Sequence, residues 1–150
     1  MKFIPVIFTV LVTLISCNLF GPEKTQGNEG VDAVRIEYLG PSTSDNTDLA
    51  TFKLVNDSTF SIQYFAYDIT SLHYSTEVLT DTGWVYLFWN WCGTGAEYFE
   101  LEAGSSVEFQ TFLPDSSCTW RVLTSISDMT GSNGYILRSE SLNTPVIKHY

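Results

Sequence analysis

The chain has 150 residues, with 17 acidic and 7 basic side chains and a net charge of −10 at pH 7. An acidic surface of this kind repels phosphate backbones, so we expect no nucleic-acid partner. The sequence has no basic cluster that could hold anionic lipid head groups, and its length suits a single domain with its own core.

The N-terminal segment has the form of a secretion signal. Lys2 precedes the uncharged and largely apolar stretch 3–15, which is shorter than the roughly 20 apolar residues that cross a hydrocarbon core. The stretch runs into Leu14-Ile15-Ser16-Cys17, which resembles the lipobox of bacterial lipoproteins. In that family the cysteine carries a diacylglycerol and the signal is removed. The resemblance implies a signal peptide at 1–16 and a lipid anchor on Cys17, and an uncleaved N-terminal anchor is the alternative.

The segment after the anchor predicts a tether. Residues 18–30 lack periodicity and are rich in Gly, Pro and polar side chains, which is typical of a flexible linker. Asn18 stands where some enteric lipoproteins carry the Asp that retains them in the inner membrane. The resemblance therefore implies an extracytoplasmic location, at the outer membrane if the organism has one. The folded domain would then be residues 31–150.

Three cysteines are an odd number for a secreted chain. If Cys17 is lipidated, Cys92 and Cys118 remain as a pair in an oxidising compartment. We therefore predict a Cys92–Cys118 disulfide, which would stabilise the fold by roughly 3 kcal/mol in the chain-entropy model. The alternative is two unpaired buried thiols.

From Val31 onward the apolar residues alternate with polar ones, which indicates β-strands rather than helices. Clusters of Gly, Pro, Asn, Asp and Ser separate the alternating runs. These features predict an all-β fold, an immunoglobulin-like antiparallel β-sandwich of seven to eight strands, with a small closed barrel as the alternative. The segment 72–79 is ambiguous. Strands are expected at 34–38, 51–54, 60–66, 84–89, 107–113, 120–126 and 135–142.

A set of short motifs over roughly 51–142 is similar to a group of extracytoplasmic β-sandwich domains of bacteria that often occur on lipoproteins. The group has no activity that could be transferred, so the resemblance implies a fold and a location only. Ala103 stands where a Pro usually precedes the glycine. The motifs are Phe52-x-Leu-x-Asn-x-Ser58, Ile62–Tyr67, Gly83-Trp84, Trp91-Cys-Gly-Thr-Gly95, Leu101-x-x-Gly-x-Ser-x-x-Phe109, Trp120-Arg-Val122 and Arg138-Ser-Glu140.

Few residues suggest chemistry. A hydrolase needs a base beside a nucleophile, and the two histidines are His73 and the penultimate His149. No Gly-x-Ser-x-Gly elbow and no Cys-x-x-Cys zinc pair is present. Asp45 and Asp48 lack the spacing of a calcium loop. We predict no catalytic residue, cofactor or metal, and we take His73 as an exposed loop histidine with a hydrolase as the weaker alternative.

Two further clusters have a structural interpretation. Glu97, Glu100 and Glu102 predict a solvated edge strand, because edge strands often carry charge. Cys92-Gly-Thr-Gly95 could form an anion nest, but it lacks the Lys and helix of a phosphate loop, so a tight turn is favoured.

The aromatic residues are the best functional lead, because four Trp, eight Tyr and ten Phe exceed what one modest core needs. A regular strand over 83–91 puts Trp89 and Trp91 on one face and Trp84 on the other. If one face is solvated, its indoles form a platform for sugar rings or a partner protein. The other interpretation is a core role, since sandwich interiors commonly pack a tryptophan against a disulfide. Trp91 is next to Cys92, and Trp120 is near Cys118.

Taken together, these patterns favour a membrane-anchored, non-enzymatic extracytoplasmic domain that recognises a protein or a glycan, with Trp84, Trp89 and Trp91 as candidate ligand-binding residues. The first alternative is an envelope structural or assembly factor without a discrete ligand. The hydrolase that would use His73 is the second.

Overall fold

The computed structural model describes residues 31–42, 49–90, 94–114 and 117–143. After a short 3-10 turn, η1 (Val31–Ala33), these residues form ten strands in two antiparallel sheets, so the predicted β-sandwich is confirmed. The sheets are separate, so the described chain does not form the closed barrel that was the alternative. The strand number exceeds the expected seven to eight because 72–79, 97–101 and a two-residue strand near the end also pair.

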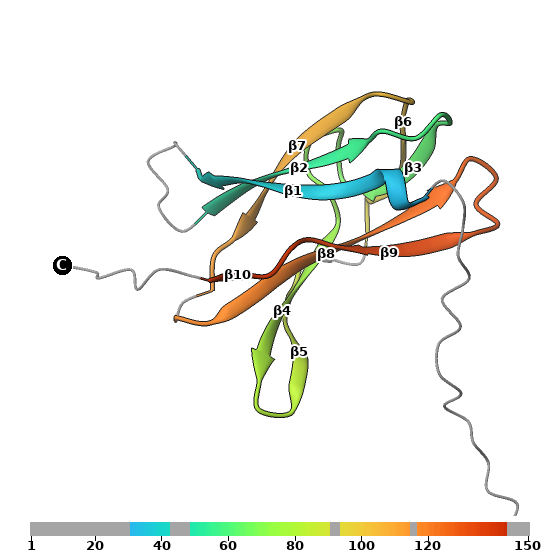
Figure 1. Cartoon of the computed structure of the whole chain (residues 1–150). Coiled ribbons are helices and arrows are strands. Elements are labelled where there is room, and N and C mark those ends of the chain that lie inside the picture. The colour runs from blue at the N-terminus through green and yellow to red at the C-terminus, as the bar shows by residue number, and fades with distance from the viewer. Residues whose placement is uncertain (1–30, 43–48, 91–93, 115–116, 144–150) are drawn as a thin grey trace, which may run out of the picture.

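The smaller sheet has the strand order β1-β2-β7 and the larger one β5-β4-β8-β3-β6, with β9 and β10 paired to β8. In Figure 1, β1 and β2 run above β8 and β9, and the β4–β5 hairpin extends below the body of the sandwich. The bounds are β1 (Val34–Pro41), β2 (Leu49–Asn56), β3 (Ile62–Ala66), β4 (Tyr74–Thr80), β5 (Gly83–Trp89), β6 (Glu97–Leu101), β7 (Ser106–Phe112), β8 (Thr119–Asp128), β9 (Gly134–Arg138) and β10 (Leu142–Asn143).

Strand β8 organises the larger sheet because it pairs with four other strands. Ile126 lies opposite Tyr64 of β3 and Tyr135 of β9. Thr124 lies opposite Tyr74 of β4 and also pairs with β9. β3 and β4 therefore follow one another along one side of β8, and β9 lies on the other side. The chain crosses from β3 to β4 through the segment 67–73, which ends at one edge of the candidate site described below.

The core lies between the sheets and is built from the inward positions of the alternating strands. Phe52 of β2 stacks on Phe109 of β7, with ring centroids 5.8 Å apart. Trp120 of β8 meets Phe52 edge-on at the same centroid distance, and only 1% of Trp120 is exposed. Burying aromatic side chains of this size stabilises the fold strongly, since truncation to Ala typically costs 3–5 kcal/mol. The core interpretation is therefore right for Trp120.

A buried asparagine joins the two sheets at one end of the sandwich. The Nδ2 group of Asn56, at the end of β2, lies within hydrogen-bond distance of the carbonyl oxygens of Phe60, Leu101 and Glu102, at 2.9, 3.0 and 3.1 Å. Its Oδ1 atom accepts a 2.6 Å hydrogen bond from the hydroxyl of Ser58. Leu101 ends β6, so Asn56 connects the smaller sheet to an edge of the larger one.

The segment 72–79, which was ambiguous from the sequence, contains most of strand β4. Glu77 is buried within β4, and its carboxylate accepts a 2.7 Å hydrogen bond from Nε of Arg121 on β8. The charge is tolerated there because the partner lies directly opposite it in register. Glu97 and Glu100 are exposed on the edge strand β6, and Glu102 is exposed directly after it, so the solvated edge is confirmed.

Candidate functional site

The outer faces of the two sheets differ in chemistry. On the smaller sheet, Glu37, Lys53 and Glu108 lie opposite one another on β1, β2 and β7. Lys53 and Arg35 form ion pairs with Glu37 at 3.1 and 2.6 Å. Hydrogen bonds from Lys53 and Arg35 hold the pKa of Glu37 below its usual value. This face is a charged, solvated surface, in contrast to the outer face of the larger sheet.

The aromatic character of the larger sheet's outer face depends on a β-bulge in β5. Tyr86 lies opposite Glu77 of β4. Phe88 lies opposite Thr76, the residue that precedes Glu77. Leu87 consequently has no partner on β4. A bulge of this kind puts two residues of one strand against one of the other and breaks the alternation of faces.

The bulge brings Trp84, Tyr86 and Trp89 to the same face. Trp84 lies opposite Leu79 and Trp89 lies opposite Ser75. Side chains of paired residues point to the same side, and residues 75, 77 and 79 of β4 alternate with its inward ones. The prediction that Trp84 faces away from Trp89 was wrong, because it assumed a strand without a bulge.

Trp84 is engaged in the fold. The guanidinium carbon of Arg121 lies 4.0 Å from the centroid of the Trp84 ring. The same guanidinium pairs with Glu77 at 2.6 Å, and both charged side chains are largely covered. Trp84, Arg121 and Glu77 therefore form a stacked cluster that stiffens the β4–β5 hairpin. This cluster leaves little of the Trp84 ring for a ligand, so Trp84 is half-buried and structural.

Among the tryptophans that the structure describes, Trp89 is the exposed one, with 57% of its surface accessible. Its indole Nε1 donates a 2.8 Å hydrogen bond to Nε2 of His73. The two rings meet edge-on, with centroids 5.8 Å apart. Because Nε2 accepts, this geometry needs the neutral imidazole with its proton on Nδ1. Of the two interpretations of the tryptophans, Trp89 follows the solvated one.

The backbone of His73 is fixed by the start of β4. Its N–H donates a 2.8 Å bond to the carbonyl of Phe65, and its carbonyl accepts from the Thr124 hydroxyl at 2.9 Å. The ring is half-buried, and this burial lowers its pKa. The prediction of an exposed loop histidine was therefore wrong. Its loop-like sequence context did not show that two neighbouring strands anchor it.

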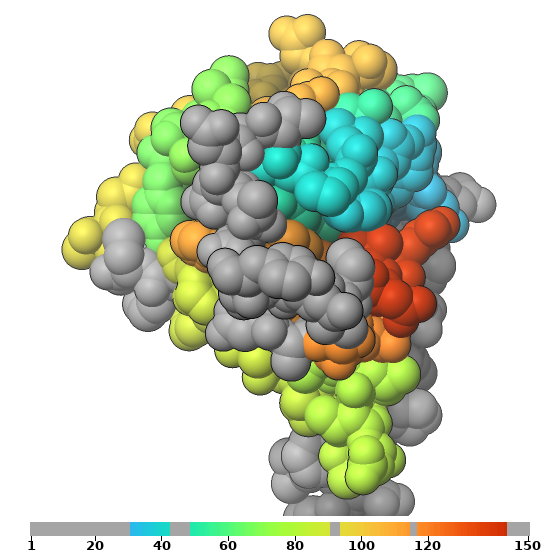
Figure 2. All heavy atoms as spheres, turned by 90° about the vertical axis from the view of Figure 1, so that its left-hand side faces the viewer, coloured from blue at the N-terminus to red at the C-terminus, as the bar shows by residue number. Residues whose placement is uncertain are grey.

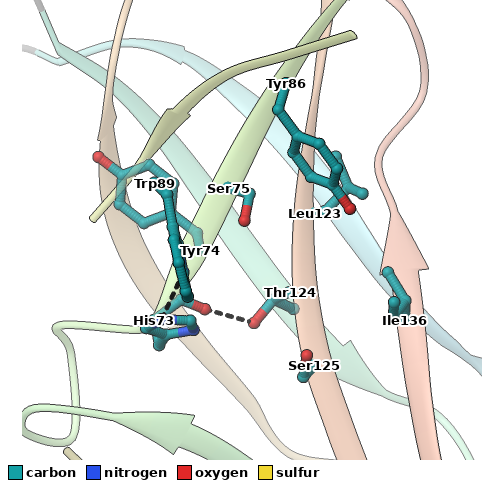
Figure 3. A pocket seen from close by; sticks show the side chains of 9 residues that line it. All are labelled: His73, Tyr74, Ser75, Tyr86, Trp89, Leu123, Thr124, Ser125 and Ile136. Carbon is teal, nitrogen blue, oxygen red and sulfur yellow. Dashed lines mark hydrogen bonds between the residues drawn. The ribbon is translucent and has the colours of Figure 1, made fainter. Parts of the chain in front are cut away.

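A groove of about 490 Å³ lies on this outer face. Trp89 and His73 stand on one side of it, and Tyr86 and Ile136 on the other (Figure 3). The hydroxyl groups of Ser75, Thr124 and Ser125 lie between these two walls. None of the residues that line the groove carries a charge at neutral pH. Its floor includes Leu123, which is buried outside the main core.

Ring contacts continue from the groove across the sheet. His73 contacts Phe65 at a centroid distance of 5.4 Å, and Phe65 contacts Tyr98 at 5.0 Å. Tyr98 lies on the edge strand β6 and is exposed. A row of four rings, Tyr98, Phe65, His73 and Trp89, therefore runs from β6 to β5. Sequence reasoning missed Tyr86, Phe65 and Tyr98, although their outward position in alternating strands is a usable signal.

The imidazole of His73 lies among the rings of Phe65, Tyr67 and Trp89. Its Nε2 atom is occupied by the indole N–H of Trp89. Among the described residues, no serine, threonine or cysteine side chain hydrogen-bonds to the imidazole of His73. No group of three His, Cys, Asp or Glu side chains within the described ranges is placed to hold a metal ion. Asp45 and Asp48 lie outside those ranges.

The disulfide prediction involves one described cysteine. Cys118 is half-buried against the core just before β8, whereas Cys17, Trp91 and Cys92 lie outside the described residues. The Cys92–Cys118 disulfide stays a prediction.

The described part of the chain contains no helix long and apolar enough to cross a membrane. The turn that follows Cys92 contains Gly95 at a φ of +86°, a conformation that favours glycine. Cys92 and Gly93 lie outside the described residues, so the choice between a tight turn and an anion nest stays open.

Comparison with known proteins finds distant structural matches. No family model and no curated protein matches the chain. A crystal structure of a Bordetella pertussis protein provisionally named ApaA has a TM-score of 0.44 and 14% identity, covering 77% of this chain and 92% of that one. A second structural-genomics target has a TM-score of 0.41 and 12% identity, covering 78% and 88%. These values are too low to carry an argument about function.

Proposed function

We propose that this protein is a lipid-anchored extracytoplasmic domain that recognises its ligand through the aromatic outer face of the larger sheet, without catalysing a reaction. The observation that carries the proposal is the exposure of Tyr86 and Trp89, at 70% and 57%, around a groove. Large exposed apolar patches are uncommon on monomeric soluble proteins and often mark interaction sites. Tyrosine and tryptophan are enriched at such sites.

The energetics of this surface support a binding role. Apolar surface removed from water contributes about 25 cal/mol per Å², so covering two large rings would favour association substantially. The hydrogen bond between Trp89 and His73 already fixes one of these rings. A side chain that is ordered before binding loses less conformational entropy in the complex. The surface therefore exposes apolar area to a ligand and is ordered before binding, and both properties favour recognition.

The anchor is the part of the proposal that the lipobox supports. In a bacterium that processes lipoproteins, the full-length protein should incorporate labelled palmitate and sediment with the membrane fraction. Cys17→Ser should abolish the label and release the protein, whereas Cys118→Ser, which removes a cysteine elsewhere, should keep both. Equal palmitate labelling of Cys17→Ser and the unmodified protein would refute the anchor.

Recognition is tested with the detergent-solubilised full-length protein and isolated cell-envelope material of the bacterium that produces it. The double variant Tyr86→Ala/Trp89→Ala should lose binding by at least about tenfold, because buried aromatics act as hot spots. Phe60→Ala is the matched control, since Phe60 is 39% exposed but lies between β2 and β3, outside the strands that carry the groove. Binding that survives the double variant yet disappears in high salt would move recognition to the charged face.

A second candidate, an envelope structural or assembly factor, is favoured by the edge of β5. Of the longer edge strands, four carry charge, with Glu97 and Glu100 on β6, Arg35 and Glu37 on β1, Glu108 on β7 and Arg138 on β9. Strand β5 contains neither a charged residue nor a proline. An uncharged exposed edge is open to pairing with another strand. Figure 2 shows the β4–β5 hairpin standing out from the body, where a neighbouring protein could reach it.

The two candidates make different demands on β5. Val85→Lys places a charge on the face of the hairpin opposite to Tyr86 and Trp89, since Val85 pairs with Val78 of β4. For a recognition domain, ligand binding in the groove should persist in this variant. For an assembly factor that pairs through β5, association with envelope proteins should fall, whereas Trp89→Ala should have little effect on it.

A further inference from the structure

We propose that the groove between Trp89 and Tyr86 binds a neutral saccharide, with a sugar ring stacked on the indole of Trp89 and its hydroxyl groups directed to Ser75 and Ser125. This inference rests on the proposed recognition function and names the ligand class of the same site.

Trp89 offers a ligand its ring face and not its N–H group. Its N–H is already used in the 2.8 Å hydrogen bond to His73. The exposed part of the indole therefore acts through its ring face, which carries the negative side of the aromatic quadrupole. The C–H bonds on one face of a pyranose ring point a weakly positive, apolar surface outward. A flat ring face and a sugar C–H face are complementary in shape and in charge.

The floor of the groove is built on paired residues of β5, β4 and β8. Trp89, Ser75 and Leu123 lie side by side in register on β5, β4 and β8. Ser75 therefore lies directly beside the exposed indole, and Ser125 is exposed on the same face of β8. A serine hydroxyl both donates and accepts, so it can pair with a sugar hydroxyl in either sense. The groove thus combines a stacking wall with hydroxyl groups at its base.

The groove suits a saccharide better than an extended peptide. A peptide backbone carries a donor and an acceptor at nearly every residue, and these need partners when they are buried. The groove runs across β5, β4 and β8, whose facing backbone groups already pair with one another. A peptide lying in it would find only scattered side-chain hydroxyls. A sugar satisfies fewer inward groups and keeps its outer hydroxyls in water.

The groove is neutral, whereas the chain as a whole is acidic. No charged residue lines the groove, and the chain has a net charge of −10. An anionic sugar would be repelled by the molecule as a whole and would find no cation in the groove. Arg138, which lies opposite Leu123 on β9, is the charged residue at the end of the Trp89–Ser75–Leu123 row. A neutral sugar would not depend on it, which makes Arg138 a useful probe.

The experiment uses the full-length protein in a detergent without a sugar head group. Neutral oligosaccharides of glucose, galactose, mannose or N-acetylglucosamine, and acidic ones that contain uronic or sialic acid, are titrated by calorimetry and tryptophan fluorescence. At least one neutral oligosaccharide should bind, with little dependence on salt. Trp89→Ala should weaken this binding by about tenfold or more, and Trp89→Phe and Ser75→Ala should weaken it less. Arg138→Gln and Phe60→Ala should leave it unchanged.

The other outcomes overturn the inference in distinguishable ways. Binding of acidic sugars alone, lost in Arg138→Gln, would mean that the ligand is anionic. Failure of every saccharide, with aromatic-dependent binding to protein from the envelope, would leave the proposed recognition function standing with a protein partner. Failure of every saccharide together with envelope binding that does not depend on Tyr86 and Trp89 would remove both the ligand class and the proposed function.

Discussion

The indole of Trp89 and the imidazole of His73 are linked by a 2.8 Å hydrogen bond in which the indole donates and Nε2 accepts. One partner lies at the end of β5, and the other directly precedes β4. The bond therefore ties the most exposed indole of the groove to the backbone that enters the larger sheet. Since Nε2 accepts only when it carries no proton, the position of Trp89 depends on the protonation of His73.

Acidification should disorder Trp89. Burial lowers the pKa of His73 below 6.5, so the neutral ring dominates at pH 7. The neutral form's contribution to stability is complete above the unfolded-state pKa of about 6.5 and is lost as the pH falls through the folded-state value. Once protonated, Nε2 becomes a donor and the bond breaks. Ligand binding and the Trp89 fluorescence maximum should then change together over the same pH range.

The control for this effect is His73→Gln, which should remove the pH dependence between neutral and mildly acidic conditions. Tyr67 is the titratable ring that contacts His73, at a centroid distance of 6.5 Å, and no ion pair among the described residues includes His73. A tyrosine does not titrate in acid. An unchanged pH profile in His73→Gln would assign the effect to another group.

The sequence was sufficient to predict the fold class but not the composition of the site. Alternation of apolar and polar residues predicted the strands that contain Phe52, Tyr64 and Trp120, because burial enforces that period on both sheets. The face occupied by Trp84 was predicted wrongly because one unpaired residue, Leu87, reverses the alternation for the rest of β5. A bulge depends on how two strands match, which a single strand's sequence does not reveal.

The location of the groove could not be predicted from the sequence for a related reason. Its walls come from segments that are far apart in the sequence, with Trp89 on β5, His73 before β4 and Ile136 on β9. Only the pairing of β4 and β9 with opposite sides of β8 brings them together. The abundance of aromatics indicated a binding surface, and the lack of basic residues indicated its neutrality. The location required the sheet order.

Deleting Leu87 should preserve the aromatic face. Without the unpaired residue, Tyr86 and Trp89 keep their outward positions because Phe88 alone then separates them in a regular alternation. The hydrogen bond from Trp89 to His73 should survive, which the pH dependence of tryptophan fluorescence would show. Insertion of one residue after Phe88 is the contrasting variant, since it should turn Trp89 inward and abolish that dependence. The same loss in the deletion variant would mean that the bulge itself positions Trp89.

The predicted Cys92–Cys118 disulfide is tested by counting thiols on the purified full-length protein, denatured without reduction. A disulfide leaves no thiol to react, and Cys118→Ser should then expose one at Cys92. Reduction should lower the free energy of unfolding by roughly 3 kcal/mol. Two reactive thiols in the unmodified protein would contradict the pairing.

Asn56 is fully buried between the sheets, and replacing it should destabilise the fold. Asn56→Ala removes the donor that the carbonyls of Phe60, Leu101 and Glu102 share. Glu102 keeps a 3.1 Å bond from the N–H of Ser105, and Phe60 keeps one of 2.8 Å from the Ser58 hydroxyl. A buried group left unpaired costs about 1–3 kcal/mol before the site relaxes. Asn56→Asp keeps the shape but replaces the donor with an acceptor. Both variants should lower the free energy of unfolding, by about 2–3 kcal/mol for Ala and by at least as much for Asp at neutral pH.

Urea denaturation followed by circular dichroism measures this loss. Asn133→Ala is the control, because Asn133 also donates through Nδ2, at 2.6 Å to Asp128, but in an exposed turn. Exposed substitutions of this kind usually change stability by less than about 0.5 kcal/mol. Acidification should partly restore Asn56→Asp, since a protonated carboxyl again has one donor for the three carbonyls. Equal stability of Asn56→Asp and the unmodified protein at neutral pH would show that Asn56 does not hold the sheets together.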